Sequence, residues 1–205
     1  MTPTRIGVTG VVLAGGRSSR FGASKLDADL DGMTVLDRTI DRLRPVVDEV
    51  FVVGRAGSRP GTRCIDDPQP FEGPLAGLAA GLEKAASEVV IVVGGDMPLV
   101  EPDVLRLLVD RLRGGTCTVA VLQDGSQPRP LPMALTCNEA REAASAAIAA
   151  GERSLRAFLT RLRVAIVPER EWRVLDPEGD SLIDVDTPAD LARASARLRR
   201  LGSCC

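Results

Sequence analysis

The chain has 205 residues, of which 44% are hydrophobic and 26% charged, the composition of one folded globular domain and not of a disordered, collagen-like or coiled-coil chain. The 26 basic and 28 acidic residues leave a formal net charge of -2, aromatic residues make up 2%, and histidine does not occur. We therefore expect no nucleic-acid binding and no chemistry that needs histidine, such as a Ser-His-Asp triad or a histidine-ligated zinc.

Apolar runs and helical spacings alternate along the chain. Short apolar or β-branched runs predict buried strands at 10–14, 49–54, 89–93, 116–122, 131–136 and 164–167. Apolar residues three and four apart predict helices at 36–43, 74–86, 102–112, 138–150 and 155–162. A last helix begins at Thr187-Pro188, where Thr187 suits the N-cap and Asp190 can complete a capping box. Residues 57–63 are predicted to be a polar loop.

Alternating strands and helices of this kind predict an α/β fold. Nearly continuous apolar strands are typical of a parallel sheet that is covered on both faces, so we expect a three-layer α/β/α arrangement with a mostly parallel sheet. No domain boundary is visible, and we expect one domain over residues 1–205 whose second half adds a lobe over the carboxyl edge of the sheet. Ligands of open α/β sheets bind at that edge.

Five cysteines, an odd number, match no zinc or CxxC spacing, which predicts free thiols in a reducing cytoplasm. The Cys204-Cys205 end is either a frayed terminus or a lipidation or redox site. The first ten residues lack the apolar core of a signal peptide, and no apolar run reaches about 18 residues. The sequence therefore predicts a cytoplasmic protein with no membrane span.

A glycine-rich segment follows the first predicted strand and carries the parts of an anion cradle. Gly15 and Gly16 allow close backbone approach, and their N–H groups can converge on phosphate oxygens. Arg20 and Lys25 follow in the same segment, one as a planar fork of donors and one as a mobile point charge. It is neither a Walker A motif nor GxGxxG. The alternative is an ordinary surface turn with solvated charges.

Acidic residues lie where other predicted strands end. Asp96 follows the most apolar strand, and a Mg²⁺ bridging it to phosphates would offset its desolvation, although it could simply cap the turn before Pro98. Asp184 and Asp186 share a face if their segment is extended, so one of them could complete the metal site. Asp186 could equally favour the dipole of the last helix.

A further acidic pair, Asp66-Asp67, follows Cys64-Ile65, where another strand ends. A carboxylate at this position could accept two hydrogen bonds from the N1–H and amino group of a guanine. The pair could equally form a turn before Pro68.

Five stretches together resemble the molybdenum cofactor guanylyltransferases, which are nucleotidyltransferases of Rossmann-like, glycosyltransferase-A-like fold. They are LAGGRSSRFGASK at 13–25, FEGPLAGLAAGL at 71–82, GGDMPLV at 94–100, GERSL at 151–155 and DVDTPADL at 184–191. They follow the family's order over nearly the whole chain. The first is the most specific, since LAGG-x-S-x-R-x-G-x-x-K is close to diagnostic of these nucleotidyltransferases.

The resemblance implies roles for the matching residues. Arg20 and Lys25 would contact the phosphates, Asp66 or Asp67 would read the guanine, and Asp96 would bind Mg²⁺. The base and phosphates would also be held by backbone groups of Leu13, Ala14, Gly15 and Gly16. The N-terminal half would thus bind the nucleotide and the C-terminal half the acceptor.

The signals for base choice disagree. Phe21 stands where the family often has Met, and Arg129-Pro130-Leu131 where it often has His-Pro-Leu. Residues 184–188 read Asp-Val-Asp-Thr-Pro instead of Asn-x-Asn-Thr-Pro, a form closer to the sister cytidylyltransferases. LAGG and GPLAG favour guanine, and they lie where the nucleotide should bind.

The reaction implied by the resemblance transfers GMP from GTP to the terminal phosphate of the molybdenum-molybdopterin cofactor and releases pyrophosphate. Arg129 and Arg153 are the candidates for gripping the pterin phosphate, with Asp96 and Asp186 (or Asp184) at the metal. Molybdoenzymes or cofactor-delivery proteins would be the partners. The alternatives are a CTP-dependent pterin enzyme, a nucleotidyltransferase for a sugar phosphate or phospholactate, a non-catalytic nucleotide-binding module and a structural partner protein.

Overall fold

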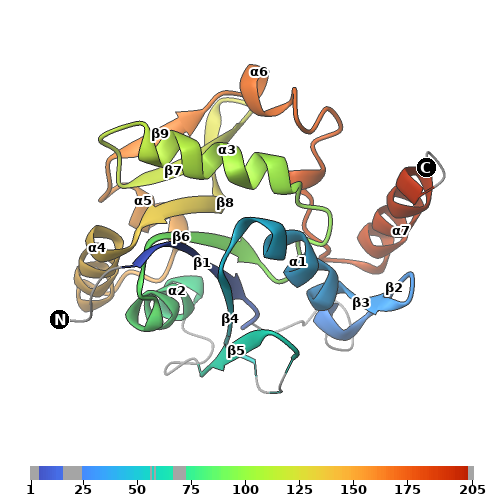
Figure 1. Ribbon diagram of the computed structural model, residues 1–205, viewed down its shortest axis with the longest axis horizontal. Coiled ribbons are helices and arrows are strands. Elements are labelled where there is room, and N and C mark those ends of the chain that lie inside the picture. The colour runs from blue at the N-terminus through green and yellow to red at the C-terminus, as the bar shows by residue number, and fades with distance from the viewer. Residues whose placement is uncertain (1–4, 16–24, 56, 58, 67–72, 203–205) are drawn as a thin grey trace.

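A computed structural model describes residues 5–15, 25–55, 57, 59–66 and 73–202. Its centre is a seven-stranded sheet of order β5-β4-β1-β6-β8-β7-β9 (Figure 1). The strands are β1 (Arg5–Leu13), β4 (Glu49–Val53), β5 (Thr62–Ile65), β6 (Ser87–Gly94), β7 (Val119–Asp124), β8 (Gln127–Thr136) and β9 (Val164–Val167). Only β8 runs antiparallel to its neighbours within this described sheet, so the prediction of a mostly parallel sheet is confirmed.

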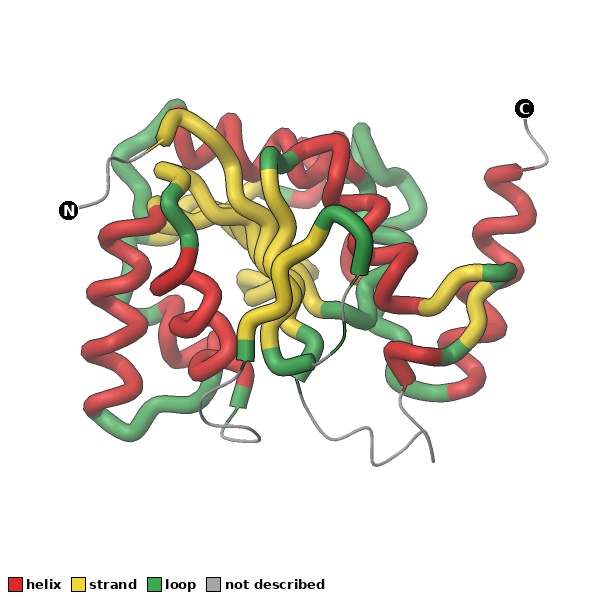
Figure 2. The backbone as a smooth tube through the Cα atoms, turned by 60° about the horizontal axis from the view of Figure 1, so that its bottom comes forward, coloured by secondary structure: helices red, strands yellow, loops and turns green. Residues whose placement is uncertain are grey.

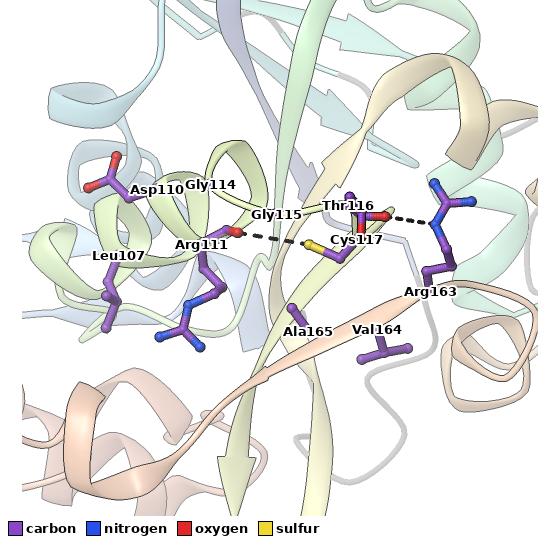
Figure 3. A pocket seen from close by; sticks show the side chains of 10 residues that line it. All are labelled: Leu107, Asp110, Arg111, Gly114, Gly115, Thr116, Cys117, Arg163, Val164 and Ala165. Carbon is purple, nitrogen blue, oxygen red and sulfur yellow. Dashed lines mark hydrogen bonds between the residues drawn. The ribbon is translucent and has the colours of Figure 1, made fainter.

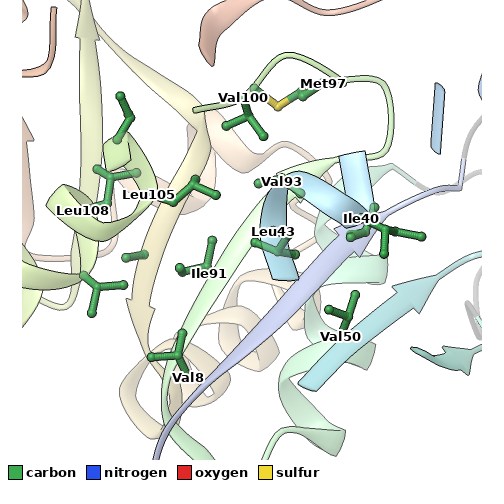
Figure 4. Close-up of a cluster of buried hydrophobic side chains, with 14 of the residues drawn as sticks. Val8, Ile40, Leu43, Val50, Ile91, Val93, Met97, Val100, Leu105 and Leu108 are labelled. Atoms are coloured by element: carbon green, nitrogen blue, oxygen red, sulfur yellow. The ribbon is translucent and has the colours of Figure 1, made fainter. Parts of the chain in front are cut away.

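Helices cover both faces of the sheet, because successive strand residues point to opposite sides. Val12, Val52 and Ile91 pack with α1 (Val35–Leu43) and α3 (Pro102–Arg113) on one face, as Figure 4 shows in part. Val11, Phe51 and Val90 pack on the other face with α2 (Pro74–Lys84), α4 (Cys137–Ala149) and α5 (Leu155–Leu159). The three-layer prediction is therefore confirmed. Among the described helices none is long and apolar enough to cross a bilayer.

A small third core holds the C-terminal helix to a two-stranded hairpin at one end of the molecule (Figures 1 and 2). The hairpin is β2 (Asp29–Leu30) with β3 (Met33–Thr34), and the helix is α7 (Pro188–Gly202). The fully or almost fully buried members of this core are Leu30, Val35, Leu99, Val185 and Ala194. The Asp31 carboxylate accepts hydrogen bonds from Ser195 at 2.9 Å and Arg199 at 3.1 Å, which ties the hairpin to α7.

The start of α7 matches its predicted cap. The Asp190 carboxylate accepts from the Thr187 N–H at 2.8 Å, and the Asp190 N–H donates to Thr187 Oγ1 at 3.2 Å. This reciprocal pair is a capping box. The hydrogen bonds from Thr187 and then Arg193 hold the pKa of Asp190 down to about 2.

Several boundaries differ from the sequence prediction. The predicted loop at 57–63 is too long, because β5 already begins at Thr62, which pairs with Val50 of β4. β8 begins at Gln127, although its prolines argue against a strand, because its first residues pair with the end of β7. The hairpin β2–β3, the 3-10 turns and the short α6 (Glu169–Trp172) were not predicted, since runs of two to four residues carry no periodic signal.

Two glycines of α2 face the sheet and offer a matched test of packing. A Cβ on Gly81 would lie 2.9 Å from Val11 Cγ1, whereas a Cβ on Gly77 would meet its nearest atoms at 3.6 Å. Both changes to alanine gain about 1 kcal/mol of helix propensity, but only the first overpacks the core, which costs about 1–3 kcal/mol. We expect urea unfolding to show Gly77→Ala as neutral or stabilising and Gly81→Ala as destabilising. Equal free energies of unfolding would contradict this packing.

Candidate active site at the carboxyl edge of the sheet

The ends of β1 and β6 lie side by side and bring two of the predicted segments together. Leu13 is in register with Gly94, and the Gly95 N–H donates to the Leu13 carbonyl at 2.9 Å. The turn that carries Asp96 is therefore fixed against the end of β1. A Cβ at Gly94 would collide with Asp96 Oδ1, so a side chain there would displace the Asp96 carboxylate from its present position.

Lys25 joins the Asp96 carboxylate and a second carboxylate. Its Nζ lies 2.5 Å from Asp96 Oδ2 and 2.6 Å from Asp186 Oδ1. The Lys25 and Asp96 side chains are 20% and 22% exposed, while Asp186 is 55% exposed. The structure thus brings together three residues that the sequence analysis singled out, from three widely separated parts of the chain.

The main chain holds Asp186 beside Asp96. The Val185 N–H donates to the Asp96 carbonyl at 2.8 Å, and the Val185 side chain is fully buried in the third core. With Val185 anchored inward, Asp186 reaches Lys25 and Asp184 reaches Arg129, whose Nη2 lies 2.6 Å from Asp184 Oδ2. Asp184 and Asp186 therefore have different partners.

The pKa values of Asp184 and Lys25 are shifted by their burial and by the charged groups beside them. Burial, and next the neighbouring charge of Asp96, raise the pKa of Asp184 to about 6, although Arg129 acts in the opposite direction. Burial alone would lower the pKa of Lys25, but the charges and hydrogen bonds of Asp96 and Asp186 outweigh it and leave that pKa raised. Lys25 is therefore an ammonium ion at neutral pH.

The described part of the glycine-rich loop is tied into the sheet. The Leu13 carbonyl accepts from Gly95, and the Ala14 N–H donates to the Val53 carbonyl at 2.9 Å, so these two groups are engaged in the fold. Gly15 is exposed beyond them. Gly16 and Arg20, for which the sequence predicts phosphate contacts, lie outside the described residues.

The remaining predicted residues are spread along the same edge. Asp66 is exposed just past the end of β5, and Asp67 lies outside the described residues. The Arg153 carbonyl accepts from the Leu75 N–H at 3.3 Å, which places Arg153 at the start of α2. Gly73 precedes that helix with a φ of +102°, and a Cβ there would lie 2.7 Å from the Arg153 carbonyl. Arg153 is thus positioned at the start of α2, and Arg129 beside Asp184.

Comparison with known proteins agrees with this arrangement. The family model "MobA-like NTP transferase domain" matches residues 10–166. The chain belongs to the MobA-like NTP transferase family. A probable molybdenum cofactor guanylyltransferase of Chloroflexus aggregans is 31% identical over 96% of this chain and 97% of its own length. One from Natronomonas pharaonis is 35% identical over 93% of this chain and 98% of its own.

Solved structures of related proteins share the fold of this chain. Molybdopterin-guanine dinucleotide biosynthesis protein A from Archaeoglobus fulgidus superposes with a TM-score of 0.81 at 27% identity, covering 94% of this chain and 99% of its own. A cytidylyltransferase from Thermus thermophilus, at 21% identity and a TM-score of 0.68 over 92% of this chain and 98% of its own, shares the fold alone. The chain is therefore a nucleotidyltransferase.

One arginine of the transferase was missed by the sequence analysis. Arg55 follows the end of β4 and pairs with Asp27, two residues after Lys25. The pair ties the carboxyl end of β4 to the short 3-10 turn Lys25–Asp27, beside a hollow of about 690 Å³. A single arginine after a strand carries no motif, so only the position of its strand in the sheet could have indicated it.

The transferase has a donor set that fits a hard divalent cation. Carboxylate oxygens of Asp96 and Asp186 both contact one ammonium nitrogen, which marks a position for positive charge between them. Mg²⁺ typically takes one or two protein carboxylates and fills its shell with phosphates and water. Within the described ranges no group of three or more acidic or cysteine side chains is placed to hold a metal ion.

A second hollow, of about 550 Å³, lies at the opposite edge of the sheet (Figure 3). It is lined by the end of α3, the segment 114–117 that leads into β7, and the start of β9. Its arginines are already engaged: Arg163 Nε donates to the Thr116 carbonyl at 2.7 Å, and Arg111 pairs with Glu171. The parallel strands begin here, so this hollow is not part of the site at the carboxyl edge of the transferase.

Proposed function

We propose that the chain transfers GMP from GTP to the terminal phosphate of the molybdenum-molybdopterin cofactor, with release of pyrophosphate. The observation that carries the proposal is the convergence of Lys25, Asp96 and Asp186 where β1 and β6 end. A cation between two carboxylates at the ligand-binding edge of an α/β sheet suits a triphosphate and a metal ion. Relatives named molybdenum cofactor guanylyltransferase, with nearly equal chain lengths, supply the choice of substrates.

The chemistry asks little of the protein beyond position and charge. An oxygen of the pterin phosphate attacks the α-phosphorus of GTP, and the bond from that phosphorus to the bridging oxygen of pyrophosphate breaks. The attacking oxygen is already ionised, so no histidine or other base is needed. Lys25 offsets the negative charge that gathers in the transition state, and it orients the phosphates.

We assign Asp96 and Asp186 as the residues that would hold Mg²⁺. Asp184 is the poorer candidate, because its carboxylate faces Arg129 and not the Lys25 nitrogen that the other two carboxylates share. When bound, the ion supplies charge neutralisation at the phosphate oxygens. Arg129 and Arg153 are the proposed contacts of the pterin phosphate. Arg129 lies between Asp184 at 2.6 Å and Asp124 at 3.6 Å, so the phosphate would compete with these carboxylates for its N–H groups.

The base is proposed to be guanine, read by Asp66 or Asp67. The proposal rests on LAGG and GPLAG in the sequence and on the names of the relatives. The free thiols of Cys64, Cys117 and Cys137 suit a reaction in the reducing cytoplasm. Molybdoenzymes or cofactor-delivery proteins are the proposed recipients of the product.

A pyrophosphate-release assay tests this function. The purified protein with Mg²⁺ is given each of the four nucleoside triphosphates, with and without molybdenum-molybdopterin. We expect release only with GTP and the pterin together. Release with CTP in place of GTP would identify a cytidylyltransferase, and GTP binding without release would identify a non-catalytic module; either outcome overturns the proposal.

A further inference from the structure

Lys25 lies in the position that the proposed function reserves for a metal ion. Its ammonium nitrogen contacts one oxygen of Asp96 at 2.5 Å and one of Asp186 at 2.6 Å. These are the two carboxylates assigned to Mg²⁺, so this inference rests on the proposed function. A second cation between the same carboxylates would be repelled by the ammonium and would compete with it for their oxygens.

The backbone on both sides of the two carboxylates is held in the fold, and among the three residues Lys25 has the longest and most flexible side chain. Asp96 lies in a turn that is bonded to the Leu13 carbonyl, and Asp186 follows Val185, whose N–H donates to the Asp96 main-chain carbonyl and whose side chain is buried. Lys25 reaches the carboxylates only through its flexible four-carbon side chain. The side chain that can leave is therefore the lysine.

We propose that Lys25 is a resident counter-cation of the nucleotide-free enzyme, which holds Asp96 and Asp186 together and moves to the triphosphate when the nucleotide binds. A divalent ion then binds well only with the nucleotide. The ordering follows from charge: the nucleotide phosphates draw the ammonium away and at the same time add ligands for the metal. Without nucleotide, the lysine protects the protein from adventitious divalent ions.

The decisive variant is Lys25→Met, which keeps the length and bulk of the side chain and removes its charge. Mn²⁺ binding is measured without nucleotide by electron paramagnetic resonance of the free ion. GTP binding is measured in EDTA by calorimetry. We expect the variant to bind Mn²⁺ about tenfold or more tightly than the wild type and GTP about tenfold or more weakly. If the role of Lys25 were merely structural, its replacement would weaken the binding of both Mn²⁺ and GTP.

Two controls complete the experiment. Lys84→Met removes an exposed lysine at the far end of α2 and should leave both affinities unchanged, which excludes a long-range charge effect. Lys25→Gln keeps a hydrogen-bond donor to the carboxylates and serves if the methionine variant does not fold. Mn²⁺ affinity that is unchanged or weaker in the Lys25 variants overturns the inference.

The two proposals fail separately. No molybdopterin enters the binding experiment, so an absence of pyrophosphate release would remove the proposed reaction and leave the exchange of cations at Asp96 and Asp186 intact. Normal pyrophosphate release by the wild type, together with an unchanged Mn²⁺ affinity in Lys25→Met, would support the proposed reaction and overturn the exchange of cations.

Discussion

Replacing Asp96 with asparagine is expected to lower the turnover number for GMP transfer by about 10²–10³-fold, as loss of one preorganised electrostatic contact typically does. Asparagine keeps the size of the side chain, and its amide oxygen can still accept a hydrogen bond from Lys25. It lacks the negative charge that would bind a metal ion and balance Lys25. The effect should therefore fall on the transition state, where charge gathers on the phosphates.

The measurement is pyrophosphate release with saturating GTP and molybdenum-molybdopterin over a range of Mg²⁺ concentrations. The variant should need more Mg²⁺ for half-maximal rate, because one of its two protein carboxylates is lost. Asp103→Asn is the matched control, since that exposed aspartate on α3 pairs only locally with Arg106 in the structure described here. Circular dichroism and the urea midpoint establish that both variants are folded. Near-normal turnover of the Asp96 variant at ordinary Mg²⁺ would refute the assignment.

Reasoning from the sequence succeeded where the signal is periodic or lies at the end of a buried strand. The leucines of 102–112 predicted α3 to within one residue, because they lie on its one buried face. The β-branched run at 89–93 predicted the centre of β6, which is buried on both faces, and missed its ends at Ser87 and Gly94. The topological rule that the carboxyl ends of neighbouring parallel strands share an edge predicted that Asp96 lies beside the end of β1. The role of Lys25, which lies well beyond that end, came from the glycine-rich segment and the resemblance.

Features that depend on contacts between distant segments could not be predicted from the sequence. Alternation placed Asp184 and Asp186 on one face and could not say which one meets Lys25. That choice is made by Arg129 of β8, which pairs with Asp184. The hairpin β2–β3 was missed, although Asp31-Gly32 is a turn signal and both residues have positive φ. Two residues per strand are too few to show alternation, and the hairpin is held by packing against α7.

The turn at 176–181 connects these distant segments, and its centre is a buried aspartate. Asp176 is 2% exposed and accepts from the N–H groups of Gly179 at 3.0 Å, Asp180 at 2.9 Å and Ser181 at 2.7 Å. Asp180 in turn pairs with Arg197 of α7 at 2.7 Å. The turn thereby positions both α7 and the segment that carries Asp186.

Asp176→Ala is expected to lower the free energy of unfolding by about 2–5 kcal/mol. The buried N–H groups of Asp180 and Ser181 lose their acceptor, and each such loss costs about 1–3 kcal/mol, less than additively where water can enter. The Gly179 N–H keeps a second acceptor, the Asp176 main-chain carbonyl at 3.1 Å. Asp176→Asn keeps one acceptor oxygen and should cost about half as much. Glu178→Ala, an exposed acidic residue of the same turn, should stay within about 0.5 kcal/mol of the wild type.

Urea unfolding measures these three free energies, and amide hydrogen exchange shows where protection is lost. Because Arg197 and Val185 anchor α7 and the 183–186 segment around this turn, exchange in the alanine variant should rise first over 176–200 and only later in β1 and β6. Mn²⁺ affinity should fall with it, since Asp186 is then no longer held beside Asp96. A loss below about 1 kcal/mol would mean that water replaces the carboxylate, and that the buried Val185 alone is sufficient to keep Asp186 in place.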